Sequence, residues 1–151
     1  MTSALVTHDL AYRAQAALYA YALAADAGDL DTLRSLAVED VVVTQAGETK
    51  HGMEPFLDIY RAFAASDVEV SRHIVTNVLA SQEDSNGVRV DAYFEATLFS
   101  ADSTSRIFGR YADSMADVDG SMKLVHKRIL VDRIMELPAA TSAYVPYASR
   151  P

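Results

Sequence analysis

Two residues of the sequence have the types and settings needed for general base catalysis. Asp26 ends an apolar segment with helical spacing, where the helix dipole disfavours a carboxylate by about 0.3–1 kcal/mol. His73 falls early in a long segment with a period of two. A carboxylate beside an imidazole fixes the ring tautomer and stabilises the imidazolium, which leaves the second nitrogen free as a base. The alternatives are a solvated loop acid and a structural strand histidine.

Tyr21 and Arg128 are the candidates for stabilising charge at the same site. Tyr21 precedes Asp26 by five residues, which separates them by about 140° on a helix and lets both reach one pocket. Arg128 shares the alternation of Leu124 and His126 in the last segment of period two, so we expect it to point into the pocket, with His126 as a weaker candidate. The alternatives are a core tyrosine and a surface salt bridge.

The elements that must position these side chains follow from the hydrophobic periodicity. Thr7 is a candidate cap for a helix that starts at His8 and stops at Gly28. Helices followed by long strands indicate an α+β fold, with the helices against the concave face of an antiparallel sheet. We expect one domain over residues 1–151, with a core over about 7–136 and an extended tail over 137–151. The other predicted elements are a short helix capped by Asp29 or Asp31, a strand over 40–44, a hairpin or loop over 45–52, a helix over 53–65, and strands over 70–82, 88–99, 106–116 and 122–135.

Composition and charge exclude several classes of protein. The chain has 151 residues, no cysteine and a net charge of −8, which argue against disulfides, thiolate metal sites and binding to nucleic acid or anionic membranes. Scattered histidines and the lack of a glycine-rich phosphate loop argue against a metal or nucleotide cofactor. We expect a cytoplasmic protein with a small-molecule substrate. Apolar residues on the opposite alternation of the last strand, Val125, Ile129 and Val131, predict a homo-oligomer, a dimer or trimer, with a sheet-to-sheet dimer preferred.

Several segments resemble the SnoaL-like branch of the nuclear transport factor 2-like superfamily. The similarity extends over about residues 10–135, and it implies a cone-shaped α+β barrel with three N-terminal helices on a curved antiparallel sheet. The segments that carry it are 19–29, 49–52 with Phe56, 71–77, 109–113 and Lys127-Arg128.

Within that branch, the sequence is similar to the group of scytalone dehydratase, bile acid 7α-dehydratase and hexachlorocyclohexane dehydrochlorinase. These enzymes use a His–Asp dyad as base, and His73 and Asp26 match its positions. Tyr21 matches a pocket position of the group, and Arg128 matches a pocket arginine of the dehydrochlorinase. The chain lacks a clear counterpart of the second strand histidine of scytalone dehydratase.

Residues and resemblance together predict a cofactor-independent lyase of the dehydratase type, acting on a small hydrophobic or polycyclic carbonyl or hydroxyl compound. A polyketide cyclase or isomerase would use the same proton abstraction without loss of a leaving group. The third alternative is a non-catalytic ring-hydroxylase β-subunit-like or ligand-binding module. If the dyad is catalytic, His73→Ala is expected to abolish turnover, and Asp26→Asn is expected to cost less because it keeps a hydrogen-bonding group beside the ring.

Overall fold

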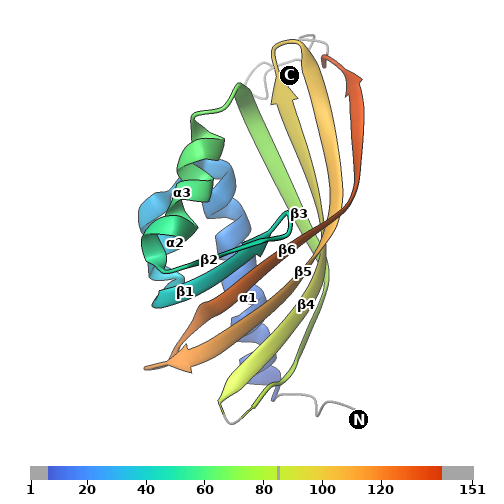
Figure 1. Ribbon diagram of the computed structural model, residues 1–151. Coiled ribbons are helices and arrows are strands. Elements are labelled where there is room, and N and C mark those ends of the chain that lie inside the picture. Colours follow the sequence, from blue (N-terminus) through green and yellow to red (C-terminus); the bar gives the residue numbers. More distant parts are fainter. Residues whose placement is uncertain (1–6, 85, 141–151) are drawn as a thin grey trace, which may run out of the picture.

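Three helices lie against the concave side of one curved sheet (Figure 1). The computed structural model describes residues 7–84 and 86–140. The predicted α+β class is confirmed. The last strand runs three residues past its predicted end, and the rest of the predicted tail lies largely outside the described residues. The elements are α1 (His8–Ala27), α2 (Leu30–Ser35), β1 (Ala37–Gln45), β2 (Glu48–His51), α3 (Met53–Ala64), β3 (Val68–Gln82), β4 (Gly87–Ser100), β5 (Ser103–Val118) and β6 (Ser121–Pro138).

Helix α1 begins and ends at the residues that the sequence signals indicate. The Thr7 hydroxyl accepts a hydrogen bond from the backbone N–H of Leu10, which caps the first turn. Gly28 adopts a φ of 65°, a left-handed conformation that a β-carbon disfavours. Asp29 then accepts from the backbone of Thr32 and caps α2. This tight turn fixes the end of α1, and with it the position of Asp26.

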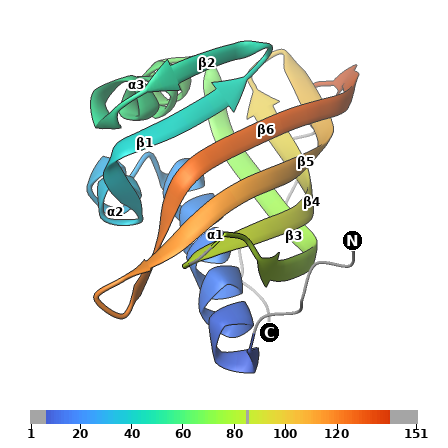
Figure 2. The same ribbon diagram turned by 60° about the horizontal axis from the view of Figure 1, so that its bottom comes forward.

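The sheet is mixed and open rather than a closed barrel. Its strand order is β2-β1-β6-β5-β4-β3, so β2 and β3 form the two edges. The four long strands β3 to β6 make the predicted antiparallel meander, whereas β1 pairs with β6 in parallel. Figure 2 shows β1 and β2 continuing the sheet beyond β6. The concave face therefore has one end at β3, next to α1, and the other at β2, next to α3.

Two irregularities reverse which side chains face the helices. The pairing of β5 with β6 slips between Ser114 and Met115, which inserts one residue into β6 near Val125. A one-residue slip moves the side chains that follow it to the opposite face of the sheet, and in β6 this lasts until a second slip, between Phe108 and Gly109 of β5, reverses the alternation again. A second irregularity in β3 surrounds Asn77, which has a φ of 54°. Strict alternation would put Asn77 on the same face as His73, but Asn77 instead lines a hollow on the other side of the sheet.

The hydrophobic core fills the space between α1, α3 and the concave face of the sheet. Phe56 and Leu57 from α3 are almost fully buried, as is Leu18 from α1. Between these helices and the sheet lies a cavity whose lining comes from α1, α3 and every strand except β2. In the part of the chain that the structure describes, no helix is long and apolar enough to cross a membrane.

Candidate active site

Asp26 and His73 lie in direct contact between the end of α1 and the edge strand β3. The His73 ring Nδ1 is 2.6 Å from Oδ1 of Asp26, and the His73 backbone N–H donates to Oδ2 at 2.8 Å. The Ser71 hydroxyl donates to Oδ1 at 2.6 Å. Both side chains are mostly buried, with exposures of 17% for His73 and 11% for Asp26. The structure therefore brings together the acid and the histidine that the sequence singled out.

The charge state of Asp26 determines the tautomer of His73. Burial alone would raise the pKa of Asp26, but the hydrogen bonds from the His73 ring, the Ser71 hydroxyl and the His73 backbone outweigh it and lower the pKa. An ionised carboxylate only accepts hydrogen bonds, so Nδ1 carries the hydrogen. Within the described residues, nothing hydrogen-bonds to Nε2. Neutral His73 therefore has one unprotonated nitrogen available to a bound molecule.

His73 lines a cavity of about 290 Å³ between the helices and the sheet. The walls are mainly aliphatic and aromatic, and no lysine, arginine, aspartate or glutamate is among the lining residues. The polar groups are the His73 ring, three tyrosines and one glutamine. The lining residues are Tyr21, Ala25, Gln45, Ile59, Tyr60, Phe63, His73, Phe94, Ala96, Leu98, Ile107, Tyr111, Ile129 and Val131.

Three tyrosines from three elements meet at one end of this cavity. The Tyr60 hydroxyl of α3 donates to the Tyr21 hydroxyl of α1 at 2.9 Å. The Tyr21 ring packs edge-on against the Tyr60 and Tyr111 rings, with centroid distances of 5.9 and 5.8 Å. Phe94 stacks on Tyr111 at 4.4 Å and lies 6.2 Å from the His73 ring. Burial is the main cause that raises the pKa of all three phenols, so they are neutral hydrogen-bond donors at pH 7.

Tyr60 and Tyr111 were not identified as site residues from the sequence. Tyr60 shares a helical face with Ile59 and Phe63, which the spacing of α3 indicates but which is equally typical of a core residue. Tyr111 belongs to a segment of period two, where nothing local distinguishes a pocket from a core. Their convergence with Tyr21 depends on how α1 and α3 cross the sheet.

A buried ion pair lies directly behind the tyrosines. The Lys127 Nζ is 2.8 Å from Oδ2 of Asp113, and both side chains are fully buried. The same ammonium lies 3.2 Å from the centroid of the Tyr111 ring and 4.1 Å from that of Tyr21. Burial raises the pKa of Asp113 and lowers that of Lys127 to about 8, against the opposing effect of each partner on the other. With a pKa of about 8 Lys127 is protonated at pH 7, and Asp113 accepts from Lys127 Nζ and from the Arg128 backbone N–H, one on each oxygen, as an ionised carboxylate does.

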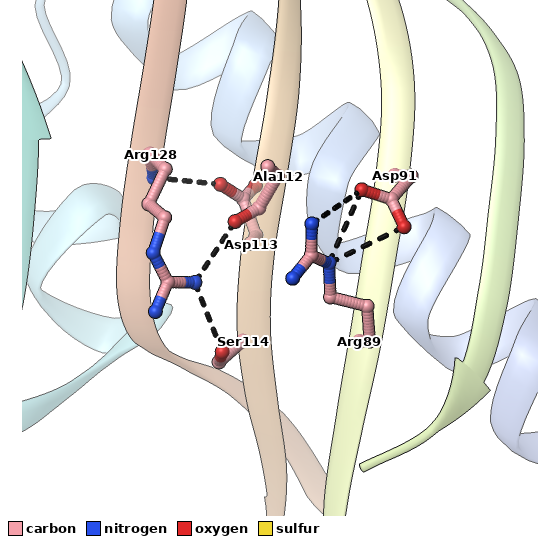
Figure 3. Close-up of polar contacts among 6 residues, drawn as sticks. All are labelled: Arg89, Asp91, Ala112, Asp113, Ser114 and Arg128. Carbon is pink, nitrogen blue, oxygen red and sulfur yellow. Dashed lines mark hydrogen bonds and ion pairs between the residues drawn. The ribbon is translucent and has the colours of Figure 1, made fainter. Parts of the chain in front are cut away.

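Arg128 lies outside the cavity, so its predicted placement in the pocket is wrong. Its guanidinium donates to the backbone oxygen of Ala112 at 3.0 Å and to the Ser114 hydroxyl at 3.1 Å. Figure 3 shows these contacts on the side of the sheet away from α1, beside the Arg89–Asp91 pair. The inserted residue in β6 is the cause, because it turns Lys127 inward and Arg128 outward.

The same slip makes the predicted outer face of β6 wrong for two of its three residues. Ile129 and Val131, expected to form an oligomer contact, line the cavity instead. Val125 remains on the surface, with 36% exposure. The weaker candidate His126 is also outside the cavity, where its Nε2 is 2.8 Å from the Thr44 hydroxyl.

Comparison with known proteins agrees with this architecture. The SnoaL-like domain model matches residues 12–128. A solved structure named as a proposed scytalone dehydratase from Novosphingobium aromaticivorans aligns with a TM-score of 0.76 and 16% identity, over 94% of this chain and 96% of that one. A type 2 hexachlorocyclohexane dehydrochlorinase aligns with a TM-score of 0.76 and 20% identity, over 91% of this chain and 95% of that one. A proposed aromatic ring hydroxylase, also from Novosphingobium aromaticivorans, aligns with a TM-score of 0.73 and 19% identity, over 85% of this chain and 92% of that one. No curated protein matches the chain.

The open curved sheet, the three covering helices and the apolar cavity define an α+β fold of the nuclear transport factor 2-like type. Because the family model covers most of the sequence, the chain belongs to the SnoaL-like domain family. Identities of 16–20% to the solved structures show the fold. The chemistry must be argued from the residues of the cavity.

Within residues 7–84 and 86–140, no group of three or more histidine, aspartate or glutamate side chains is placed to hold a metal ion. The ionisable side chains that reach the cavity are His73 and the three tyrosines. These side chains provide one base and a set of neutral hydrogen-bond donors.

Proposed function

We propose that the protein is an enzyme that removes a proton from a carbon atom of a small carbonyl compound, and that it acts as a lyase of the dehydratase type. The observation that carries this proposal is the free Nε2 of His73 in an apolar cavity, with Nδ1 held by an ionised carboxylate. The names of two similar structures, a proposed scytalone dehydratase and a dehydrochlorinase, support elimination chemistry.

The proposed reaction starts with proton transfer from the carbon next to the carbonyl to Nε2 of His73. Asp26 stabilises the imidazolium that forms, through the 2.6 Å contact with Nδ1. The electron pair of the C–H bond moves onto the carbonyl oxygen, which accepts a hydrogen bond from a tyrosine hydroxyl that is not already donating within the cluster. When a hydroxyl group lies on the next carbon, the electron pair returns to form C=C. The hydroxyl then leaves with the proton from His73 as water.

The cavity favours an uncharged substrate. Its lining contains neither an ammonium nor a guanidinium group that would neutralise a carboxylate or a phosphate. Its volume of about 290 Å³ is at the lower end for small-molecule sites. We therefore propose a small, largely apolar ring compound with one carbonyl group at the tyrosine end.

Isomerisation or cyclisation is the alternative, because the same proton abstraction starts each reaction. Incubation in D₂O with a panel of ketones and β-hydroxy ketones, followed by mass spectrometry, separates the cases. Loss of one water indicates a lyase, whereas deuterium uptake or a new isomer without that loss indicates an isomerase or cyclase. His73→Ala is the control and should abolish either result. If no carbonyl compound changes, the cavity is a binding site and the enzymatic proposal is wrong.

A further inference from the structure

The buried Lys127–Asp113 pair has no part in the proton transfer described above, yet it lies beside the cavity. Both side chains have no exposed surface, and neither lines the cavity. Transferring an ion pair from water into a protein interior is costly, and apolar residues of similar volume often stabilise a fold as well or better. Stability alone therefore gives little reason for an ammonium group at this place.

The position of the ammonium group connects it to the cavity through two aromatic rings. Nζ of Lys127 is 3.2 Å from the centroid of Tyr111 and 4.1 Å from that of Tyr21, and both rings line the cavity. A cation on the face of a phenol ring attracts its π electrons. This withdrawal of electron density makes the phenol hydroxyl a stronger hydrogen-bond donor. The low-dielectric surroundings increase the effect of a charge at this distance.

We propose that Lys127 is a positioning residue that acts through the Tyr21 and Tyr111 rings to stabilise negative charge on an oxygen atom bound in the cavity. The inference rests on the proposed function, since an enolate oxygen would carry that charge during proton abstraction. A charge behind the rings stabilises an anion that forms in the cavity but offers no direct contact to an anionic substrate.

The groups that face Lys127 set the size of this effect. Asp113 of β5 opposes it, because its charge raises the pKa of Tyr21, Tyr60 and Tyr111. The phenols of α1, α3 and β5 are neutral at pH 7, and Asp26 further raises the pKa of Tyr111. Removing Lys127 alone would leave the Asp113 charge behind, so a test needs a variant in which both charges are absent.

The experiment measures binding of 4-nitrophenol, whose ionised form has its own absorbance band, and of nitrobenzene as the uncharged analogue. The variants are Lys127→Met and the double variant Lys127→Met/Asp113→Asn, whose amide oxygen can still accept the bond from the Arg128 backbone. The matched control is Lys123→Met, which removes the same charge from the same strand outside the cavity. We expect the pKa of bound nitrophenol to rise by about one unit in the double variant, which is a tenfold loss of affinity for the anion relative to the neutral form. The rise should be larger in Lys127→Met, where the opposing charge of Asp113 remains.

Nitrobenzene affinity should stay the same in all variants, because it carries no charge for Lys127 to stabilise. An unchanged pKa of bound nitrophenol, or an equal rise in Lys123→Met, would overturn the proposal. Loss of nitrobenzene binding in both Lys127 variants would show that the Lys127–Asp113 pair only maintains the structure of the cavity. That outcome would also overturn the proposal. The binding assay needs no turnover, so it tests Lys127 separately from the proposed catalytic function. An unchanged nitrophenol pKa would overturn the role of Lys127 but not that of His73 as a base. Conversely, a lack of activity in the carbonyl panel would not alter the measured nitrophenol pKa values.

Discussion

The substitution Asp26→Asn tests the proposed base most sharply, because the carboxylate receives two different N–H groups of His73. The backbone N–H bonds to Oδ2, and the ring Nδ1 bonds to Oδ1. Asparagine is nearly the same size but has one acceptor oxygen and one NH₂ group. It can therefore satisfy only one of the two donors in their present positions.

The backbone N–H cannot change its role, so the asparagine oxygen should turn toward it. The NH₂ group then faces Nδ1 and the Ser71 hydroxyl. A neutral imidazole responds by moving its hydrogen to Nε2, which turns Nδ1 into an acceptor. With its hydrogen on Nε2, His73 can no longer take a proton from a bound molecule. The geometry therefore revises the expectation from sequence that this change would cost less than His73→Ala.

The expected loss is large for so small a change of shape. The equivalent exchange in the serine-protease triad reverses the histidine tautomer and costs about 10⁴-fold in rate. Removing a general base outright costs about 10²–10⁴-fold. We therefore expect Asp26→Asn and His73→Ala to be similarly inactive toward any substrate found in the carbonyl panel.

Nitrogen-15 NMR of the His73 ring checks the reasoning without a substrate. The wild type should show a protonated Nδ1 and an unprotonated Nε2, and Asp26→Asn should show the reverse. Ser71→Ala is the matched control, since it removes one hydrogen bond to Asp26 but leaves both His73 contacts in place. It should keep the wild-type tautomer and most of the activity. If Asp26→Asn also keeps an unprotonated Nε2, the argument is refuted.

Three further predictions concern stability and assembly. In Gly109→Ala the new β-carbon would lie 2.5 Å from Cε1 of Phe94, so we expect a loss of about 1–3 kcal/mol and a lower melting temperature; an unchanged melt would contradict this packing. The pKa of Asp26 is lowered in the fold, so the ionised carboxylate contributes stability above its ordinary pKa of 3.8, and this contribution is lost as the pH falls through the pKa of the folded state. The difference in melting temperature between wild type and Asp26→Asn should therefore become smaller in acid. A difference that stays constant with pH would contradict the lowered pKa. Ile74 and Tyr93, 59% and 57% exposed, support a proposed homodimer through the outer sheet face, which light scattering would exclude by giving the 16.4 kDa of one chain.

The parts of the site that could be predicted are those that depend on residues close together in the sequence. The end of α1 at Gly28 depends on neighbouring residues, and so does the alternation that places His73 on the inner face. Arg128 was misplaced because one inserted residue in β6 reverses the alternation, and this insertion has no distinctive local sequence. The same error hid the inward position of Lys127. The parallel pairing of β1 with β6 depends on contacts between distant segments, which periodicity does not report.

The three hydrogen bonds to Asp26 also have a consequence for the solubility of the protein. Strand β3 is an edge of the sheet, and outward N–H groups of an edge strand can pair with a strand of another chain unless they are covered. The His73 N–H is one of these groups, and Asp26 already occupies it. Helix α1, tied to the strand at residues 71–73, also stands in the way of an incoming strand. Asp26→Ala, which has no acceptor for this N–H, would thus expose a template for β-aggregation and would also remove the carboxylate that orients His73.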